Sequence, residues 1–283
     1  MKKYQKQSGM TVDAEYGEEQ GNPFFEALPE ILGKEEVMKR LRSQIPYPKD
    51  IQKMSPEERR KEVMEISKWF YPMDYMYTIY DMLYRAMSAT YQTKNIVDHI
   101  RQMNDLYMDF RTGREREFQY ATQAYTGAVL GVPGIGKTST VQRCLSLMPQ
   151  VIVHTNYGGK PMYTKQINYL FVECPSDCSV RTLAFNIFSA IDRAIGSDYL
   201  KQATYQRAVA ASATTTKLKI ICMNHHIGLI VIDEIQNAIQ TAVKNRQLKP
   251  LVKFLVELTN ETSTGICFCG TMEAEDLFMS QEH

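Results

Sequence analysis

The second half of the chain contains three short apolar runs, and each is followed by acidic, polar or glycine-rich sequence. They are Ala128–Leu130, Leu229–Ile232 and Ile266–Cys269. The four apolar residues from Leu229 to Ile232 show no alternation, which is typical of a strand buried on both faces in a parallel sheet. We therefore predict that the three runs are strands of one such sheet.

Segments with helical periodicity separate these runs. In residues 179–195, apolar residues recur at every fourth position and Gly196 follows, so we predict a helix that ends there. Further helices are predicted over 137–147, 203–224 and 248–260, further strands over 151–154 and 168–173, and a turn over 155–161. Alternating strands and helices predict a three-layer α/β fold with a parallel sheet.

The first 120 residues divide into two parts. Residues 1–55 are polar and broken by prolines, which predicts an extended arm or short helices rather than an independent core. This arm contains the aromatic segment Asn22–Pro29, which must dock on another surface or remain exposed. Residues 56–120 have a helical pattern, with Ser55 as the cap and Pro56 in the first turn.

Met and Tyr residues recur at spacings of three and four in this helical region. The stripe comprises Met73, Met76, Tyr77, Tyr80, Leu83, Tyr84, Met87 and Tyr91. Such a stripe predicts the packed face of an amphipathic helix. An alternative is that Trp69, Tyr71 or a neighbouring aromatic residue lines an adenine pocket, because the segment before a phosphate loop commonly does so.

The residues after the first apolar run form the pattern G-x-x-x-x-G-K-[ST], which is typical of a P-loop, the loop that wraps the phosphates of a nucleotide. Glycines allow the backbone to turn its N–H groups toward one anion, and the following helix adds the positive end of its dipole. Lys137 then reaches the β- and γ-phosphates, and the Thr138 hydroxyl is placed to bind Mg²⁺. The predicted ligand is therefore ATP with Mg²⁺. The predicted nucleotide-binding residues are Gly131, Val132, Pro133, Gly134, Ile135, Gly136, Lys137, Thr138 and Ser139.

Two acids follow the second apolar run, at the carboxyl end of its strand, where open α/β sheets bind their ligands. Asp233 fits a Mg²⁺ partner that acts through water, and Glu234 fits the base that orients and deprotonates the attacking water. In a P-loop ATPase with an additional strand, the third run lies between the other two, so Thr271 at its end is predicted to sense the γ-phosphate. The alternative for Thr271 is an ordinary turn. We thus predict Lys137, Glu234 and Thr271 as catalytic residues, and Thr138 and Asp233 as metal-binding residues.

Composition agrees with an ATPase that stays in the cytoplasm. The 283 residues are 44% hydrophobic, which is enough to bury a core, and the net charge of +1 argues against a strongly basic tail that binds nucleic acid. The sequence has no signal peptide and no apolar run of about eighteen residues, so no membrane span is expected. Its six cysteines form no C-x-x-C pair, and a zinc site is not expected.

Several segments together resemble the TnsC family of AAA+ ATPases, which regulate cut-and-paste transposons, and its shorter relative TniB. These segments are Asn22–Pro29 upstream of the phosphate loop, Ala190–Tyr199 and Gly228–Gln236. The resemblance reaches nearly the whole chain. It implies a bacterial protein with a partner-facing arm over residues 1–55, a helical region over 56–120 and an AAA+ core over 121–283.

The resemblance also implies activities that spacing does not show. TnsC-like proteins assemble with ATP on double-stranded DNA as rings or filaments, receive a signal from TnsD or TniQ, and recruit the TnsB transposase, with TnsA where present. ATP hydrolysis disassembles the polymer, and Lys137, Thr138, Asp233, Glu234 and Thr271 carry over as the nucleotide and catalytic residues. The residues in roughly matching places for contacts with the DNA backbone are Lys160, Lys165, Ser179 and Arg181.

The sequence departs from the AAA+ pattern after the third run. That pattern has the strand order 5-1-4-3-2, an arginine finger after the sensor strand and a helical lid, whereas the last arginine here is Arg246. We expect a core truncated before strand five and the lid, with the strand before Gly131 as an unpaired edge, and a chain that binds ATP better than it hydrolyses it. Two other functions remain open: a helicase loader or IstB-like ATPase, and a non-hydrolysing switch driven by ATP binding.

Overall fold

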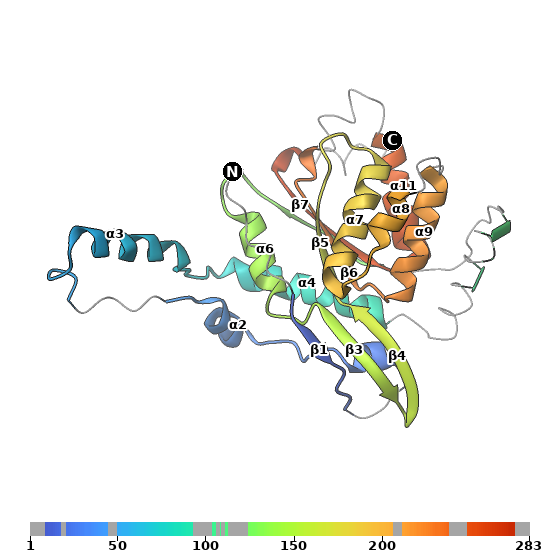
Figure 1. The fold of residues 1–283 in the computed structure, drawn as a ribbon, viewed down its shortest axis with the longest axis horizontal. Helices are drawn as coiled ribbons and strands as arrows, with labels where there is room; N and C mark the ends of the chain where they lie inside the picture. The colour runs from blue at the N-terminus through green and yellow to red at the C-terminus, as the bar shows by residue number, and fades with distance from the viewer. Residues whose placement is uncertain are drawn as a thin grey trace.

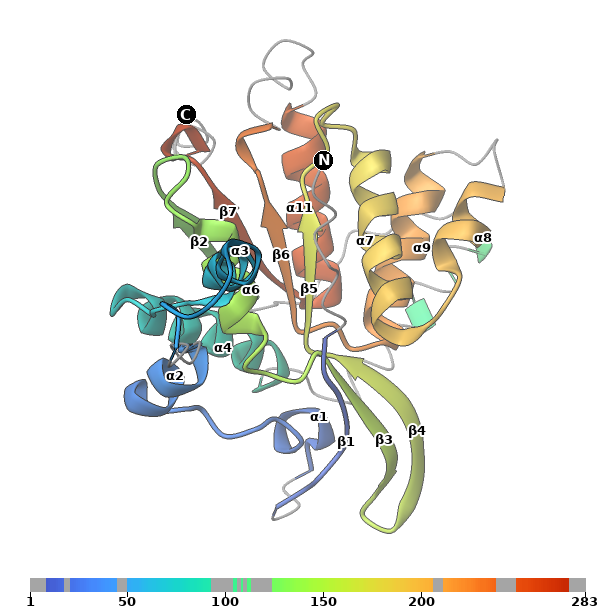
Figure 2. The same cartoon turned by 60° about the vertical axis from the view of Figure 1, so that its left-hand side comes forward.

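A parallel sheet of four strands forms the centre of the protein. The computed structural model describes residues 9–17, 21–44, 50–92, 104–105, 108, 111–112, 124–205, 211–237 and 248–274. The sheet has the order β2-β7-β6-β5, and every neighbouring pair in it is parallel (Figure 1 and Figure 2). The strands are β2 (Thr126–Leu130), β7 (Gly265–Gly270), β6 (Leu229–Asp233) and β5 (Tyr169–Glu173). This confirms the predicted α/β fold, with β7 between β2 and β6.

Alternate residues of each central strand belong to two separate hydrophobic clusters. In β6, Ile230 and Ile232 lie in one cluster, whereas Leu229 and Val231 lie in the other. The face with the first cluster is covered by α7 (Val180–Ile195), α9 (Ala211–Asn224) and α11 (Leu248–Thr262), and α8 (Tyr199–Tyr205) lies beside α7. The face with the second cluster is covered by α4 (Tyr75–Gln92) and α6 (Lys137–Leu145) (Figure 2). Both faces of the sheet are therefore buried, and the fold has the three predicted layers.

Helix α4 covers the sheet with the predicted stripe of Met and Tyr residues. The buried residues of the stripe are Met76, Tyr80, Leu83, Met87 and Tyr91, while Tyr77 and Tyr84 are partly buried. Met73, just before the helix, is 54% exposed. At the other end of α4, the Thr90 hydroxyl donates to the carbonyl of Gly228 at 2.9 Å, and the Tyr91 hydroxyl donates to that of His226 at 2.8 Å. The stripe is thus a packed face, as predicted, and its surface is the central sheet.

The N-terminal segment docks on the same side of the sheet. It contains β1 (Thr11–Asp13), α1 (Pro23–Glu26) and α2 (Lys34–Leu41). The Asn22 side chain accepts from the backbone N–H of Phe25 and donates to the carbonyl of Tyr91 at 2.8 Å. Phe24 is 4% exposed and stacks on the ring of His226 with the centroids 3.8 Å apart. The aromatic segment therefore docks on the chain's own core, and one hydrophobic cluster crosses the boundaries predicted at residues 55 and 120.

A long hairpin of β3 (Val151–Tyr157) and β4 (Lys160–Ile167) extends below the central sheet, and β1 pairs with β3 in parallel (Figure 2). The turn predicted over 155–161 is in the right place but too long, because β3 continues to Tyr157 and β4 begins at Lys160. Only Gly158 and Gly159 form the turn, with φ of 57° and 70°. The predicted length is wrong because this part of the hairpin has its side chains mostly in solvent, so the strands are polar and lack the pattern of a core strand.

Helix α3 (Pro56–Glu65) and the short helix η1 (Ile66–Lys68) extend away from the rest of the protein (Figure 1). Ser55 caps α3 as predicted: its hydroxyl accepts from the N–H of Glu58 at 3.3 Å, and the Glu58 carboxylate accepts from the N–H of Ser55 at 2.8 Å. No residue of α3 is buried. This helix is therefore stabilised by its cap rather than by a packed face.

The remaining predicted elements agree with the structure where it describes them. Helix α7 is followed by Gly196 at φ 73°, and α11 (Leu248–Thr262) covers the residues of the helix predicted over 248–260. A 3-10 helix, η2 (Met272–Ala274), follows β7. Most of the predicted helical region after residue 92, part of the helix predicted over 203–224, and Arg246 lie outside the described residues. Within the described ranges, no helix combines the length and the apolar character that crossing a bilayer requires.

Gly228 offers a test of how α4 joins the sheet. A Cβ at this position would lie 2.7 Å from the backbone oxygen of Asn168 and 2.7 Å from the Tyr91 hydroxyl. We expect Gly228→Ala to lower the free energy of unfolding by about 1–3 kcal/mol, because backbone and a buried ring must shift. The control is Gly17→Ala, since no atom lies within 4 Å of a Cβ there. Urea titration of both variants measures the difference, and equal midpoints would contradict this packing.

Candidate nucleotide-binding site

The phosphate loop joins β2 to α6 through two glycines with left-handed backbone. Gly134 has φ 80° and Gly136 has φ 88°, a region that L-residues with a Cβ rarely adopt. Gly136 is the N-cap of α6 and provides no side-chain acceptor for the first N–H groups of the helix. These N–H groups and the helix dipole therefore suit an anionic ligand at the loop.

Lys137 places its charge over this loop. Its Nζ donates to the carbonyl oxygens of Gly131 and Val132, each at 3.0 Å. The side chain thus runs back along the loop from the first residue of α6, so its ammonium lies beside the first two residues of the loop. This is the position from which a lysine reaches the phosphates of a bound nucleotide.

Thr138 and Asp233 meet across the gap between α6 and β6. The Thr138 hydroxyl donates to Oδ2 of Asp233 at 2.7 Å, and Asp233 is 5% exposed. A hydroxyl and a carboxylate provide the hard oxygen ligands that Mg²⁺ prefers. The two residues predicted as metal partners are therefore side by side, and their donor set fits this ion.

Glu234 leaves the line of β6 immediately after Asp233. The carbonyl of Asp233 still accepts a hydrogen bond from the backbone N–H of Cys174, just after β5, at 2.8 Å. The next residue, Glu234, has φ 56°, which is not a strand conformation. A positive φ at glutamate is uncommon and costs about 1 kcal/mol or more. The turn directs Glu234 out of the sheet, where its carboxylate accepts a hydrogen bond from Nε2 of Gln236.

Thr271 lies at the end of β7, beside both the phosphate loop and the β6 turn. Its backbone N–H donates to Oε1 of Gln236 at 3.1 Å, and the carbonyl of the preceding Gly270 accepts from the N–H of Gly131 at 3.2 Å. The Thr271 hydroxyl oxygen is buried and has no hydrogen-bond partner within the described part of the chain. A buried hydroxyl without a partner suits contact with a ligand, and the sensor role remains a prediction.

The residues predicted to contact DNA lie at three places: the hairpin turn and the two ends of α7. Lys160 is exposed next to the hairpin turn, and Lys165 donates to the carbonyl of Ile195 at 3.1 Å, at the C-terminal end of the helix. Ser179 caps the opposite end, and Arg181 lies over the ring of Phe185 at 5.3 Å. With 16 residues, α7 is about 24 Å long, and Lys165 lies five residues along β4 from Lys160, about 16 Å, so these residues do not form one patch.

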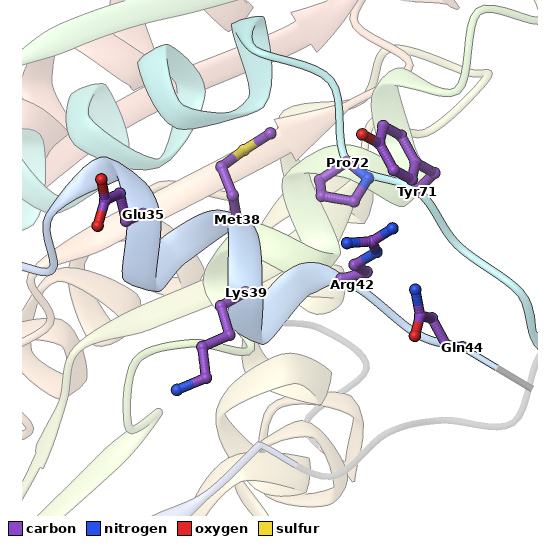
Figure 3. Close-up of a pocket in the computed structure, with 7 residues that line it drawn as sticks. All are labelled: Glu35, Met38, Lys39, Arg42, Gln44, Tyr71 and Pro72. Carbon is purple, nitrogen blue, oxygen red and sulfur yellow. The ribbon is translucent and has the colours of Figure 1, made fainter.

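The aromatic residues before α4 lie beside a surface hollow of about 540 Å³. Trp69 and Tyr71 stack on each other with centroids 6.3 Å apart and are 55% and 51% exposed. Figure 3 shows the residues that line the hollow, none of which belongs to the phosphate loop: Glu35, Met38, Lys39, Arg42, Gln44, Tyr71 and Pro72. The structure therefore does not join this hollow to the loop, and an adenine contact by Trp69 or Tyr71 remains a prediction.

All six cysteines are buried. Burial raises the pKa of Cys144 and of Cys267 to about 12, so these thiols remain protonated at neutral pH. Burial, and then the neighbouring Asp233 carboxylate, raises the pKa of Cys269. The cysteines thus act as small apolar residues of the core.

Sequence reasoning missed two polar arrangements. The first is Gln236, which bridges Glu234 and Thr271. The sequence signal that could have indicated it is an amide side chain two residues after the acidic pair. The second is Lys219, which is 6% exposed and lies 3.0 Å from Glu257 and 2.9 Å from Glu261. Two glutamates four residues apart on α11 are its signal. Burial raises the pKa of Glu261, and Lys219 opposes this effect.

Comparison with known proteins agrees with this arrangement. A family model described as an AAA domain matches residues 120–278, which is more than half of the chain and includes every residue of the phosphate loop and of the β6 turn. The comparison with curated proteins finds no match.

Substitutions at Thr138 can distinguish a role in metal binding from a role in packing. We expect Thr138→Val to weaken Mg²⁺-dependent nucleotide binding about tenfold or more, because valine keeps the shape and removes the hydroxyl. Thr138→Ser, which keeps the hydroxyl, should bind nearly as wild type. Titration with a fluorescent ATP analogue, with Mg²⁺ and with EDTA, measures this, and an equal Mg²⁺ effect in both variants would exclude Thr138 as a metal partner.

Proposed function

The chain belongs to the AAA domain family, and on that premise we propose that it is an ATP-dependent, DNA-binding regulator of transposition of the TnsC or TniB type. AAA domains are nucleotide-dependent ATPases that usually use Mg²⁺. The observation that carries ATPase chemistry here is the 2.7 Å contact of Thr138 with Asp233, which joins the phosphate loop to the acidic strand. Glu234, the residue after Asp233, would then lie next to the bound nucleotide.

Each residue of the site has a distinct task in this proposal. Lys137 and the N–H groups of the loop hold the phosphates. Thr138 and Asp233 would hold Mg²⁺, which neutralises charge on the phosphate oxygens when bound. Glu234 orients a water and accepts its proton, and the Thr271 hydroxyl donates to the γ-phosphate.

ATP binding, in this proposal, promotes assembly of the chain on double-stranded DNA as a ring or filament in the bacterial cytoplasm. Lys160, Lys165, Ser179 and Arg181 contact the phosphate backbone without reading sequence. Separated contacts on each subunit, repeated along a polymer, would bind by avidity even though the net charge is only +1. ATP hydrolysis then releases the assembly.

The proposed partners follow from the resemblance of Asn22–Pro29, Ala190–Tyr199 and Gly228–Gln236 to the TnsC family. A target selector of the TnsD or TniQ type would bind the N-terminal arm, and the TnsB transposase, with TnsA, would be recruited to the assembly. Phe24 anchors the arm to the core, so the selector would contact the residues of the arm that remain exposed. Met10 and Ile31, which are 49% and 42% exposed, are two of them. A helicase loader of the IstB type would share the nucleotide site, and a non-hydrolysing switch would not need Glu234.

Glu234→Gln distinguishes an ATPase from a switch. The amide keeps the shape and removes the base, so we expect phosphate release to fall about 100-fold or more while ATP binding is retained. Assembly on DNA should then persist longer with ATP. The matched control is Glu273→Gln, an exposed acid beyond Thr271.

The measurements are phosphate release and electron microscopy with duplex DNA and a non-hydrolysable ATP analogue. Equal phosphate release by wild type and Glu234→Gln would contradict hydrolysis through Glu234. If no ordered assembly forms on DNA, the transposition proposal fails, even if ATP is hydrolysed.

The hairpin lysines give a test of DNA binding. We expect Lys160→Ala to weaken binding to duplex DNA at every sequence. Because one lysine neutralises about one DNA phosphate, the slope of log affinity against log salt concentration should become shallower by about one unit. Lys253→Ala, an exposed lysine on α11, is the control. Fluorescence anisotropy at several salt concentrations measures both slopes, and equal slopes would remove Lys160 from the interface.

A further inference from the structure

One side chain connects two parts of the site that are far apart in sequence. Nε2 of Gln236 donates to Oε2 of Glu234, and Oε1 of Gln236 accepts from the backbone N–H of Thr271 at 3.1 Å, across 35 residues. Gln236 is half-buried, as is Glu234. The amide thus bridges the turn after β6 and the end of β7.

The orientation of this amide is fixed by its two partners. A backbone N–H can only donate, so the amide oxygen must face Thr271. The amide nitrogen must then face Glu234, whose carboxylate can only accept. A reversed amide would place two donors together at Thr271 and two acceptors together at Glu234. Neither an ionised glutamate nor an apolar residue of the same length can provide both contacts.

The end of β7 is shaped to admit the bridge. A Cβ at Gly270 would lie 2.6 Å from Oε1 of Gln236 and 2.7 Å from Cγ2 of Ile235, so glycine is required for this close approach. The carbonyl of the same glycine accepts from Gly131 at the start of the phosphate loop. A continuous set of hydrogen bonds therefore runs from the loop, through the end of β7 and Gln236, to the carboxylate of Glu234.

We infer that Gln236 is a positioning residue, which fixes the carboxylate of Glu234 relative to the phosphate loop and Thr271. The inference deepens the proposed function and rests on Glu234 as the base. One carboxylate oxygen is held by the amide, so the direction of the other oxygen toward a water is set. Because a base misplaced by about 1 Å loses much of its effect, loss of the bridge should lower turnover without lowering nucleotide affinity.

The contact itself is tested through stability, with no need for activity. In Gln236→Glu, two carboxylates face each other, and repulsion raises their pKa in the folded protein above the value in the unfolded chain. The folded state then binds more protons, so stability relative to wild type should fall as pH rises from 5 to 8. Gln236→Met has no added charge, so its destabilisation should be nearly independent of pH.

Among the residues that the structure describes, the other charged groups at this edge of the sheet include Asp233 on β6, Glu173 at the end of β5, Glu273 after β7 and Lys137 on α6, and both variants retain them. Urea midpoints at several pH values between 5 and 8 provide the comparison. Equal pH dependence in the two variants would overturn the bridge.

An exchange variant provides the matched control. In Glu234→Gln with Gln236→Glu, the amide at 234 can donate to the carboxylate at 236, whose other oxygen can still accept from Thr271. We expect the pH-dependent destabilisation of Gln236→Glu to disappear in this double variant, although hydrolysis does not return. Additive effects of the two single changes would overturn the proposed pairing.

Turnover then tests the positioning role. For Gln236→Met we expect kcat for ATP to fall about tenfold or more, while KM and the affinity for a fluorescent ATP analogue stay within about twofold of wild type. An unchanged kcat with an active wild type would overturn the positioning role alone. If the wild type binds ATP and DNA but releases no phosphate, both the proposed ATP hydrolysis and the positioning role are overturned. The stability experiments would still show whether Gln236 bridges Glu234 and Thr271.

Discussion

The structure depends on covering both faces of a parallel sheet. Each strand alternates its side chains between two apolar clusters, and neither face can be left in water. The helices that follow β5 and β6 cover one face in the usual α/β manner. The other face is covered by α6 together with α4, which precedes the whole sheet in sequence. Anchoring α4 beside Gly228, at the start of β6, fixes the strand whose other end carries Asp233 and Glu234.

The site is held together at the carboxyl ends of three strands by short polar contacts. The phosphate loop bonds to the end of β7, Thr138 bonds to Asp233, and Gln236 bonds to both Glu234 and Thr271. The left-handed backbone at Glu234 is the strained position among them, and the carbonyl of Glu234 accepts from the N–H of Asn237 at 2.9 Å in the turn that follows. Backbone strain of this kind concentrates at active sites and ligand-binding sites.

The parts of this arrangement that follow local rules could be predicted from sequence. The glycines of the loop, the unbroken apolar run before Asp233 and the four-residue period of α7 each reflect one local physical requirement. The full length of the β3–β4 hairpin could not be predicted, because a solvated strand has no apolar alternation to reveal it. The stripe on α4 predicted burial but not the surface that buries it. The roles of Gln236 and Gly270 depend on a hydrogen bond across 35 residues, which no local pattern encodes.

The shared cluster on the α4 face also affects how the chain is made. Phe24, Val37 and Leu41 pack with residues as late as Cys269. During synthesis, these early residues and the apolar side of α4 leave the ribosome long before β6 and β7 exist to receive them. Contacts this distant in sequence close slowly, and the nascent chain exposes apolar surface until they form. The N-terminal segment is thus synthesised before its packing partners and can complete its packing only after they have been made.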